Sequence, residues 1–484
     1  MRRIFRPVVI LLSAAFLAAS CLGDDDTSDI TYYSDTAITS FSLGTLNRTM
    51  YTKTSDGKRD SSYIGEVDGS EYKFYIDQAG RRIYNADSLP VRTDNAHVIC
   101  NIGTKNGGLA VIEYKNTAGE DSLVYYDSTD SLDFSGAEPM RVRVYANDLE
   151  NYRTYQISVN VHKENPDSMN WHYFDAYEPF TRLDGMKAVT FGGSGDAQDR
   201  LLLLGRSGDE TVVYGIDADG RCGELSRISG GEAYATAVAK GDSVYATTGD
   251  GTIARSADGR AWDVVTVAGS VKPARLMAAG ERRLYGTDAD GRMVSSAQAG
   301  HGWTADGMAA DADGLPTGSV SCGTFALKTY GEGERVVMIG NRATGSHPED
   351  SVAMVWSKLE EYAENSERHS WMHVNEDNGM QLPRLEGLAA AACGDVLVAI
   401  GGQGLGTSHA KAYSQIYVSQ DNGLTWSEDG RFYLPAGFNG TGAAAAMAVD
   451  NKGFIWIICG GTGEVWRGRL NRMGWADQKT SFTE

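Results

Sequence analysis

The sequence repeats itself from residue 170 onward, and this repeat constrains the fold more than any other feature does. Segments of strand-forming residues recur there with a period of roughly forty to sixty residues. A repeat of this length that is built from strands, and not from helices, indicates the blades of a β-propeller. Each unit is marked by an apolar run, at residues 201–204, 244–246, 283–285, 336–339, 396–400 and 454–458.

The number of runs predicts the number of blades. Six runs predict six blades, and alanine-rich segments such as 389–392 and 443–449 precede two of them. Alanine suits the crowded innermost strand near a propeller axis. A spare strand-like segment, 171–174, precedes the first unit, and we expect it to close the ring by pairing with the last blade. Seven blades are the alternative.

Two copies of one short motif predict tight turns inside the blades. The first copy contains Ser256, Asp258, Gly259 and Trp262, and the second contains Ser419, Asp421, Gly423 and Trp426. Serine and aspartate oxygens accept hydrogen bonds from the backbone of a turn, glycine permits positive φ, and tryptophan packs between blades. We therefore interpret both aspartates as structural, and we predict no catalytic residue.

The second copy, S-x-D-x-G-x-T-W, resembles the Asp-box of sialidase-like and BNR-repeat propellers. A sialidase also needs an arginine cluster, a tyrosine nucleophile with a glutamate partner, and an F-R-I-P-like segment near its start. No such segment occurs, and Arg384 in the run 382–385 is not equivalent to it. The resemblance therefore implies a fold and not an activity.

Two adjacent later units have long polar turns between their second and third strands, at residues 340–350 and 401–413. Neighbouring long loops on one face predict a binding patch, and two solvated hairpins are the alternative. Four side chains on these loops are the candidate ligand-binding residues: Arg342, His347, His409 and Tyr413.

Residues 37–165 read as short alternating strands, and the clearest pair, 140–146 and 152–161, predicts a final hairpin with one buried face. This ending resembles immunoglobulin-like and cadherin-like modules of Bacteroidetes surface proteins. A polar stretch with proline, 163–167, marks the boundary. The expected fold class is all-β, with an N-terminal immunoglobulin-like β-sandwich followed by a six-bladed (alternative seven-bladed) β-propeller over residues 170–480.

The start of the chain has the order of a secretory signal. Three arginines precede an apolar run, and small residues then lead to Cys21. The segment 17–21 resembles a bacterial lipobox, which implies a lipoprotein signal peptide over 1–20 and lipid on Cys21. An acidic tether, 21–36, includes Asp24 to Asp26, and its resemblance to an export signal implies an outer-membrane lipoprotein that is exposed at the surface.

Net charge and cysteine content argue against binding of nucleic acid or metal and against a disulfide framework. The net charge is −20, and removal of residues 1–20 takes away three arginines and no acids, which makes it −23. Such a polyanion repels nucleic acid. After Cys21 an odd number of cysteines remains, with no CxxC motif and no Cys/His cluster of metal spacing. We expect no metal site, no cofactor and no disulfide framework.

The whole chain resembles the two-domain Bacteroidetes lipoproteins described as DUF6242-like, with a propeller of the BNR type. The resulting hypothesis is a cell-envelope lipoprotein that is anchored to the membrane through Cys21 and displays a non-catalytic propeller for binding a glycan or a surface protein. A carbohydrate-active enzyme of glycoside hydrolase type and a structural subunit of an outer-membrane complex are the alternatives.

Replacing Cys21 with serine tests the anchor. We expect the wild-type chain to partition into the detergent phase and the Cys21→Ser variant to stay in the aqueous phase, because several acyl chains on one cysteine give stable anchoring. Intact-mass measurement should show acylation of the wild type alone. Equal partition of both chains, with no added mass, would contradict the prediction.

Overall fold

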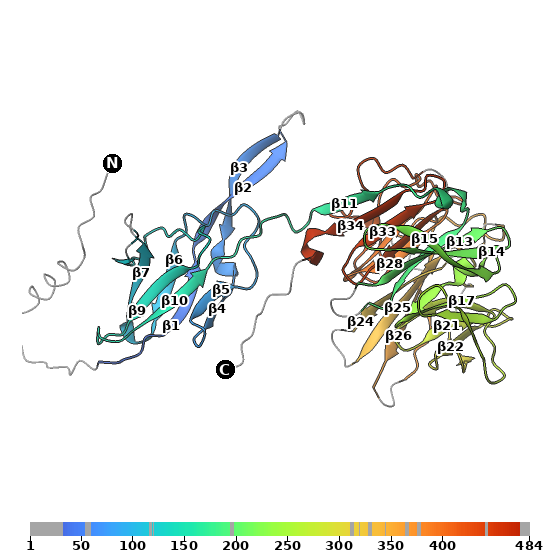
Figure 1. Ribbon diagram of the computed structural model, residues 1–484, viewed down its shortest axis with the longest axis horizontal. Coiled ribbons are helices and arrows are strands. Elements are labelled where there is room, and N and C mark those ends of the chain that lie inside the picture. The colour runs from blue at the N-terminus through green and yellow to red at the C-terminus, as the bar shows by residue number, and fades with distance from the viewer. Residues whose placement is uncertain are drawn as a thin grey trace, which may run out of the picture. The chain divides into compact units, whose positions relative to one another are not determined.

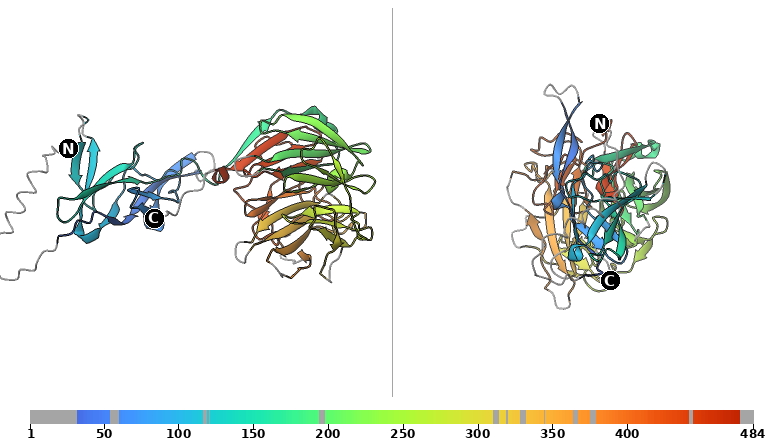
Figure 2. Two further views of the ribbon diagram at one scale, coloured as in Figure 1. Left: turned by 60° about the horizontal axis from the view of Figure 1, so that its bottom comes forward. Right: turned by 90° about the vertical axis from the view of Figure 1, so that its left-hand side faces the viewer.

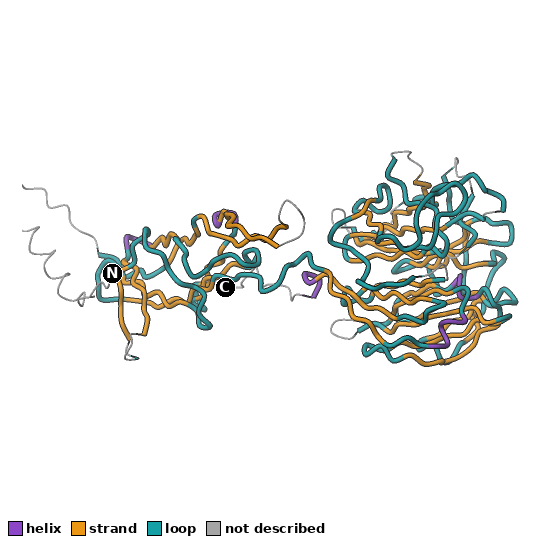
Figure 3. The backbone as a smooth tube through the Cα atoms, turned by 90° about the horizontal axis from the view of Figure 1, so that it is seen from above, coloured by secondary structure: helices purple, strands orange, loops and turns teal. Residues whose placement is uncertain are grey.

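The computed structural model describes residues 32–474, except 54–59, 116–118, 120, 194–197, 310–313, 319, 328–331, 344, 364–366, 375–378 and 441–443. These residues fall into two compact units, one ending at Pro166 and the other beginning at Asp167. Strands make up nearly all of the regular structure, and helices are short turns (Figure 3). No helix within the described ranges is long and apolar enough to cross a membrane. Cys21 and the predicted signal peptide lie outside the described residues.

The first unit is built from three antiparallel or mixed sheets. One sheet has the order β4-β5-β10-β9-β7-β8, and the pairs β1-β6 and β2-β3 form the others. The strands are β1 (Ile38–Leu43), β2 (Thr45–Lys53), β3 (Asp60–Asp68), β4 (Phe74–Asp77), β5 (Arg82–Asn85), β6 (Cys100–Thr104), β7 (Leu109–Lys115), β8 (Asp121–Tyr125), β9 (Met140–Tyr145) and β10 (Tyr152–Ser158), with short helices η1 (Gly69–Glu71) and η2 (Lys105–Gly107).

The predicted final hairpin of this unit is present. β9 and β10 pair antiparallel from Tyr145 with Tyr152 to Met140 with Ile157. Val142, Val144, Tyr155 and Ile157 alternate with more exposed residues and are fully buried in one hydrophobic core. β10 also pairs in parallel with β5, so the hairpin lies in the middle of the large sheet.

The second unit contains six four-stranded antiparallel sheets among its described residues. In chain order the strands are β11 (Met169–Phe174), β12 (Met186–Phe191), β13 (Arg200–Ser207), β14 (Glu210–Ile216), β15 (Cys222–Ser229), β16 (Val238–Lys240), β17 (Ser243–Thr247), β18 (Ile253–Ser256), β19 (Asp263–Val265), β20 (Arg275–Ala279), β21 (Leu284–Thr287), β22 (Met293–Ser296), β23 (Thr304–Ala305), β24 (Ser321–Ala326), β25 (Gly333–Gly340), β26 (Met354–Glu361), β27 (Met372–Val374), β28 (Ala389–Cys393), β29 (Val396–Ile400), β30 (Tyr417–Ser419), β31 (Ser427–Glu428), β32 (Ala445–Val449), β33 (Ile455–Cys459) and β34 (Val465–Leu470). Short helices are η3 (Glu178–Arg182), η4 (Ala233–Thr236) and η5 (Asn471–Gly474).

The sheets are arranged in a closed ring. Their first strands lie side by side in the order β12, β16, β20, β24, β28 and β32, and β32 lies beside β12 again. Side chains join neighbouring strands of this inner circle: Thr190 Oγ1 donates to the backbone oxygen of Val449 at 2.7 Å, and Ser321 Oγ accepts from the backbone N–H of Ala390 at 2.9 Å.

The last sheet takes strands from both ends of the unit. β11 pairs antiparallel with β34, from Met169 with Leu470 to Phe174 with Val465. The two strands lie next to each other in Figure 1, and the same green and red strands are adjacent in Figure 2. The prediction that segment 171–174 pairs with the last strands is therefore confirmed.

Small side chains let the inner strands approach one another. Ala446 and Ala448 on β32 pack against Ala188 on β12, in a core that also contains Leu203 and Trp456. Ala446 is 1% exposed, and it packs in this core, so a larger side chain at that position would have to displace its neighbours. The alanine-rich segments of the sequence are thus the strands nearest the axis.

The inner strands should be sensitive to added volume. We expect Ala446→Leu to lower the free energy of unfolding by about 1–3 kcal/mol, because extra methyl groups overpack a closed core. The matched control is Ala261→Leu, at an exposed position in a turn. Urea unfolding followed by tryptophan fluorescence measures both, and equal midpoints would show that the ring has space at Ala446.

Candidate functional site

The two S-x-D turns connect the third and fourth strands of their sheets, and hydrogen bonds within each turn occupy the aspartate. Asp421 Oδ1 accepts from the backbone N–H of Thr425 at 2.9 Å and from Ser419 Oγ at 2.8 Å, and Oδ2 accepts from Thr425 Oγ1 at 2.6 Å. Burial raises the pKa of Asp421, but these bonds outweigh it and hold the pKa below its ordinary value. Gly423 has a φ of +96° and donates its N–H to Ser419 Oγ at 2.8 Å. Trp426 donates its indole N–H to Gly423 O at 3.0 Å.

The first copy has the same turn with one difference. Asp258 Oδ1 accepts from two backbone N–H groups, and Ser256 Oγ accepts from the N–H of Gly259 at 2.8 Å. The indole of Trp262 instead donates to Ser226 Oγ on β15 of the preceding sheet, at 3.0 Å. Both aspartates satisfy their own turns, which makes them unsuited to act on a ligand.

Two long loops lie at the other end of the sheets, and they pack on each other. The 341–353 loop connects β25 to β26, and the 401–416 loop connects β29 to β30. Thr407 Oγ1 donates to the backbone oxygen of Glu349 at 2.8 Å, and the N–H of Thr407 donates to Asp350 O at 3.3 Å. The loops that the sequence predicted to be neighbours therefore touch.

Arg342 is held within its own loop. Its guanidinium donates to both carboxylate oxygens of Asp350, at 2.9 and 2.7 Å. These hydrogen bonds, and the positive charge behind them, hold the pKa of Asp350 below its ordinary value. Arg342 is thus largely neutralised inside the protein, which weakens its predicted role as a charged ligand contact.

Arg384 fixes this loop from beneath and was not a sequence-predicted site residue. It is 0% exposed, and it donates to the backbone oxygens of His347 and, at 2.7 Å, of Arg342. Its Nη1 also lies 3.9 Å from Asp350 Oδ2. The one signal in the sequence was an arginine between the buried leucines Leu382 and Leu385.

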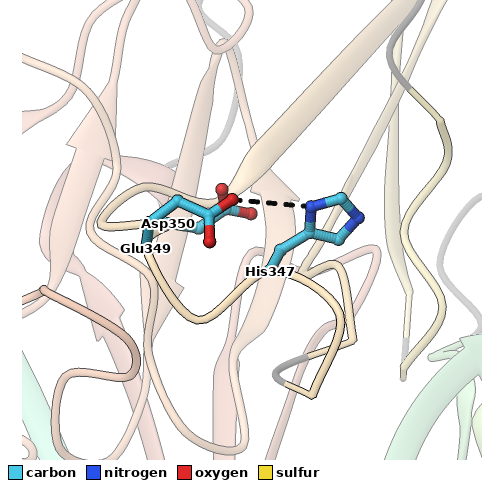
Figure 4. A group of neighbouring side chains, drawn as sticks. All are labelled: His347, Glu349 and Asp350. Carbon is cyan, nitrogen blue, oxygen red and sulfur yellow. Dashed lines mark ion pairs between the residues drawn. The ribbon is translucent and has the colours of Figure 1, made fainter.

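His347, Glu349 and Asp350 form a small cluster of groups that can coordinate a metal (Figure 4). Their ligand atoms lie within 4.8 Å of one another, and His347 Nδ1 is 3.8 Å from Glu349 Oε1. Asp350 is already bonded to the guanidinium of Arg342, and a second guanidinium, that of Arg384, lies nearby. Two positive charges beside the carboxylate disfavour a cation there.

The remaining two predicted residues, His409 and Tyr413, differ in their exposure to solvent. His409 is exposed on the 401–416 loop. Tyr413 is only 8% exposed, and its ring packs edge-on against Phe438 with 5.7 Å between centroids. The ring of Tyr413 therefore supports the loop from the core side, and its position gives no support to a contact with a ligand.

A cavity of about 720 Å³ occupies the axis of the ring, and sequence reasoning missed it. All six innermost strands contribute to its wall, which is mostly alanine, glycine and other small residues. Asn341, Arg342, Ala343 and Leu405 border it, so it extends to the end of the sheets that carries the two long loops. Asn341 also donates to Leu385 O at 2.8 Å.

The charged groups of the cavity are few. Among the lining residues that the structure describes, Asp184 is the one carboxylate, and it is bonded to Arg206 at 2.7 Å. Lys187 on β12 lies in the wall, and its Nζ donates to the backbone oxygen of Val320 at 2.6 Å. Cys322 is close to it, and burial raises the pKa of that thiol. These described lining residues include no pair of carboxyl groups of the kind that glycoside hydrolysis uses.

Comparison with known families covers both units. Residues 165–478 match the family described as the DUF6242 beta propeller domain. Residues 41–159 match the family described as the N-terminal domain of DUF6242, a domain of unknown function. No curated protein matches the chain.

Several solved structures resemble part of the chain. YCF48 from Cyanidioschyzon merolae is 14% identical, with 62% of this chain and 98% of that one covered and a TM-score of 0.31. The SapL1 lectin in complex with alpha methyl fucoside is 14% identical, with 68% and 97% covered and a TM-score of 0.33. BamB from Moraxella catarrhalis is 13% identical, with 69% and 94% covered and a TM-score of 0.29.

The buried side chain of Arg384, which holds the 341–353 loop at the mouth of the cavity (its end between the two long loops), gives a testable prediction. We expect Arg384→Met to cost about 2–4 kcal/mol of unfolding free energy, because two partly buried carbonyls and Asp350 lose a charged partner. Hydrogen exchange should also speed up in the 341–353 and 401–416 loops. The control is Arg260→Met at an exposed position. Unchanged exchange in both loops would mean that Arg384 does not hold them.

Proposed function

Because this chain belongs to the DUF6242 family, whose C-terminal part is a β-propeller, we propose that it is a binding protein and that its ligand enters the axial cavity between the two long loops. The observation that carries this proposal is the cavity itself. It lies on the axis of a closed ring, has a volume of about 720 Å³, and is bordered at one end by Ala343 and Leu405. Ligand sites are concave, largely preformed and few in each protein.

The composition of the cavity favours binding over catalysis. Glycoside hydrolysis needs two carboxyl groups on either side of the scissile bond. The described lining offers only Asp184, whose oxygen is engaged by Arg206. The aspartates of the two S-x-D turns lie at the other end of their sheets and bond to their own turns. A propeller that binds without chemistry fits these contacts better than a carbohydrate-active enzyme does.

The scarcity of aromatic side chains among the described residues that line the cavity indicates the class of ligand. A neutral sugar is usually held by stacking on exposed aromatic rings. Tyr413 is buried, and Tyr234 is the one aromatic residue among the described residues that line the cavity. Polar backbone groups and a lysine are available instead. These features favour a ligand with charged or hydrogen-bonding groups, such as an acidic glycan or a segment of a surface protein.

The rest of the chain suits display of such a module. In the proposed arrangement, lipid on Cys21 anchors the chain to the outer membrane, and residues 37–165 form an immunoglobulin-like spacer. Each four-stranded sheet of the second unit counts as one blade, which makes a six-bladed propeller with its binding face available at the cell surface. The acidic composition, with a net charge of −23 once residues 1–20 are removed, suits a body held clear of an anionic membrane.

Blocking the mouth tests the binding role. The mature chain is screened on arrays of glycans and of peptides, together with Ala343→Trp, which places an indole at an exposed position on the rim. The matched control is Ala261→Trp, at an exposed position in a turn at the opposite end of the sheets. We expect Ala343→Trp alone to lose about tenfold or more in affinity for the ligands that the wild type binds.

Two results would contradict the proposal. One is undiminished binding by Ala343→Trp, which would place the site away from the cavity. The other is release of cleaved sugar from an array glycan by the wild type, which would make the protein an enzyme.

A further inference from the structure

One lysine side chain crosses the axial cavity. Lys187 lies on β12, and its Nζ donates to the backbone oxygen of Val320, the residue before β24, at 2.6 Å. In the circle of inner strands, β12 and β24 are three places apart out of six, so they face each other across the axis. The ammonium group therefore lies within the space that an entering ligand would occupy.

No anion in the described part of the chain is paired with this ammonium group. From β24 it meets Cys322, whose thiol donates to the backbone oxygen of Ala279 at 3.1 Å and stays protonated because burial raises its pKa. Arg275 on β20 is near enough to act on Lys187 as a second positive charge. The elements packed against β12 carry no carboxylate: their titratable groups are Arg200 and Arg206 on β13, Tyr234 on η4, Lys240 on β16 and Tyr245 on β17, and β32 has none.

Arg275 adds to the positive potential at the same place. Its guanidinium donates to the backbone oxygens of Thr317, at 2.5 Å, and Gly318. Both of these residues line the cavity. The two cations are thus bonded to neutral carbonyl groups, which accept hydrogen bonds but do not cancel charge.

An enclosed cation without an anion is costly, and the cost is visible in the acidity of Lys187. An ammonium group has three donors, and a carbonyl satisfies one of them. Burial lowers the pKa of Lys187 from 10.5 to about 8; Cys322 acts against this shift, and the positive charge of Arg275 acts with it. Near neutral pH the group is still charged, so an anion that entered the cavity would gain an ion pair and hydrogen bonds in a low-dielectric site.

We propose that the ligand of the axial cavity carries a carboxylate and that the ammonium of Lys187 is the partner of this group. The proposal rests on the binding role proposed above and specifies its chemistry. A carboxylate fits better than a phosphate group, because Lys187 is the one lysine of the described wall and the guanidinium of Arg342 is already bonded to Asp350. Free small acids and the acidic end of a polypeptide are two sources of the same group.

Titration calorimetry on the mature chain tests the proposal with defined probes. Succinate represents a free acid, a short peptide with a free C-terminus represents a chain end, and the same peptide amidated lacks the group. Inorganic phosphate is the competing anion. We expect binding of at least one carboxylate probe and weaker binding of the amidated peptide and of phosphate. Which of the two probes binds identifies the source.

Two variants test whether Lys187 itself binds the carboxylate. We expect Lys187→Met to weaken carboxylate binding by about tenfold or more. Lys240→Met, which removes a lysine from the neighbouring β16, should leave it unchanged. Lys187→Met should unfold at or above the wild-type temperature, because it removes an unpaired enclosed charge, so loss of binding would not reflect loss of fold.

The pH dependence gives a second readout. Lys187 loses its proton as the pH rises through about 8. Affinity of the wild type for the carboxylate should therefore fall between about pH 7 and about pH 9.5, and that of Lys187→Met should stay flat.

The outcomes separate the two proposals. Equal affinity of wild type and Lys187→Met, or no binding of any carboxylate probe, would overturn the role of Lys187. If Ala343→Trp still abolished binding of an array ligand, the cavity would remain the binding site. If Ala343→Trp also had no effect on any bound ligand, both proposals would fail.

Discussion

The pairing of β11 with β34 is the contact on which the propeller depends. It joins strands from the two ends of the unit over six residue pairs, from Met169 with Leu470 to Phe174 with Val465. Phe174 also stacks on Trp456 with 5.7 Å between centroids, in the core that β32 shares with β12. Without this pairing the last sheet would lack its outer strand, and the ring would lose support where its first and last sheets meet.

The functional features follow from the closed ring. Six strands around one axis leave a central space, and their alanines keep it from being filled. At one end of the sheets, the two short S-x-D turns satisfy their own hydrogen-bonding groups. At the other end, the two long loops border the axial cavity. Lys187 enters this space, because its side chain extends from one side of the ring to the carbonyl of Val320 on the other.

The sequence predicted what is local or periodic. Strand positions, the hairpin of β9 and β10, the turn geometry at Asp421 and the contact between the two long loops all follow from patterns of a few residues. It did not predict the cavity or the positions of Lys187 and Arg384, because their partners lie 133 and about 40 positions away along the chain. In both cases a cation within an apolar segment was the only signal. The burial of Tyr413, which is 8% exposed, was also not predicted, because a loop residue can point into the core.

The most direct test of this account is a crystal structure of the mature chain grown with a carboxylate ligand identified by calorimetry. The account predicts density for the ligand in the axial cavity, with a carboxylate oxygen within hydrogen-bonding distance of Lys187 Nζ and the rest of the molecule leading toward the mouth between the two long loops. An empty cavity with the ligand bound elsewhere on the chain would contradict it.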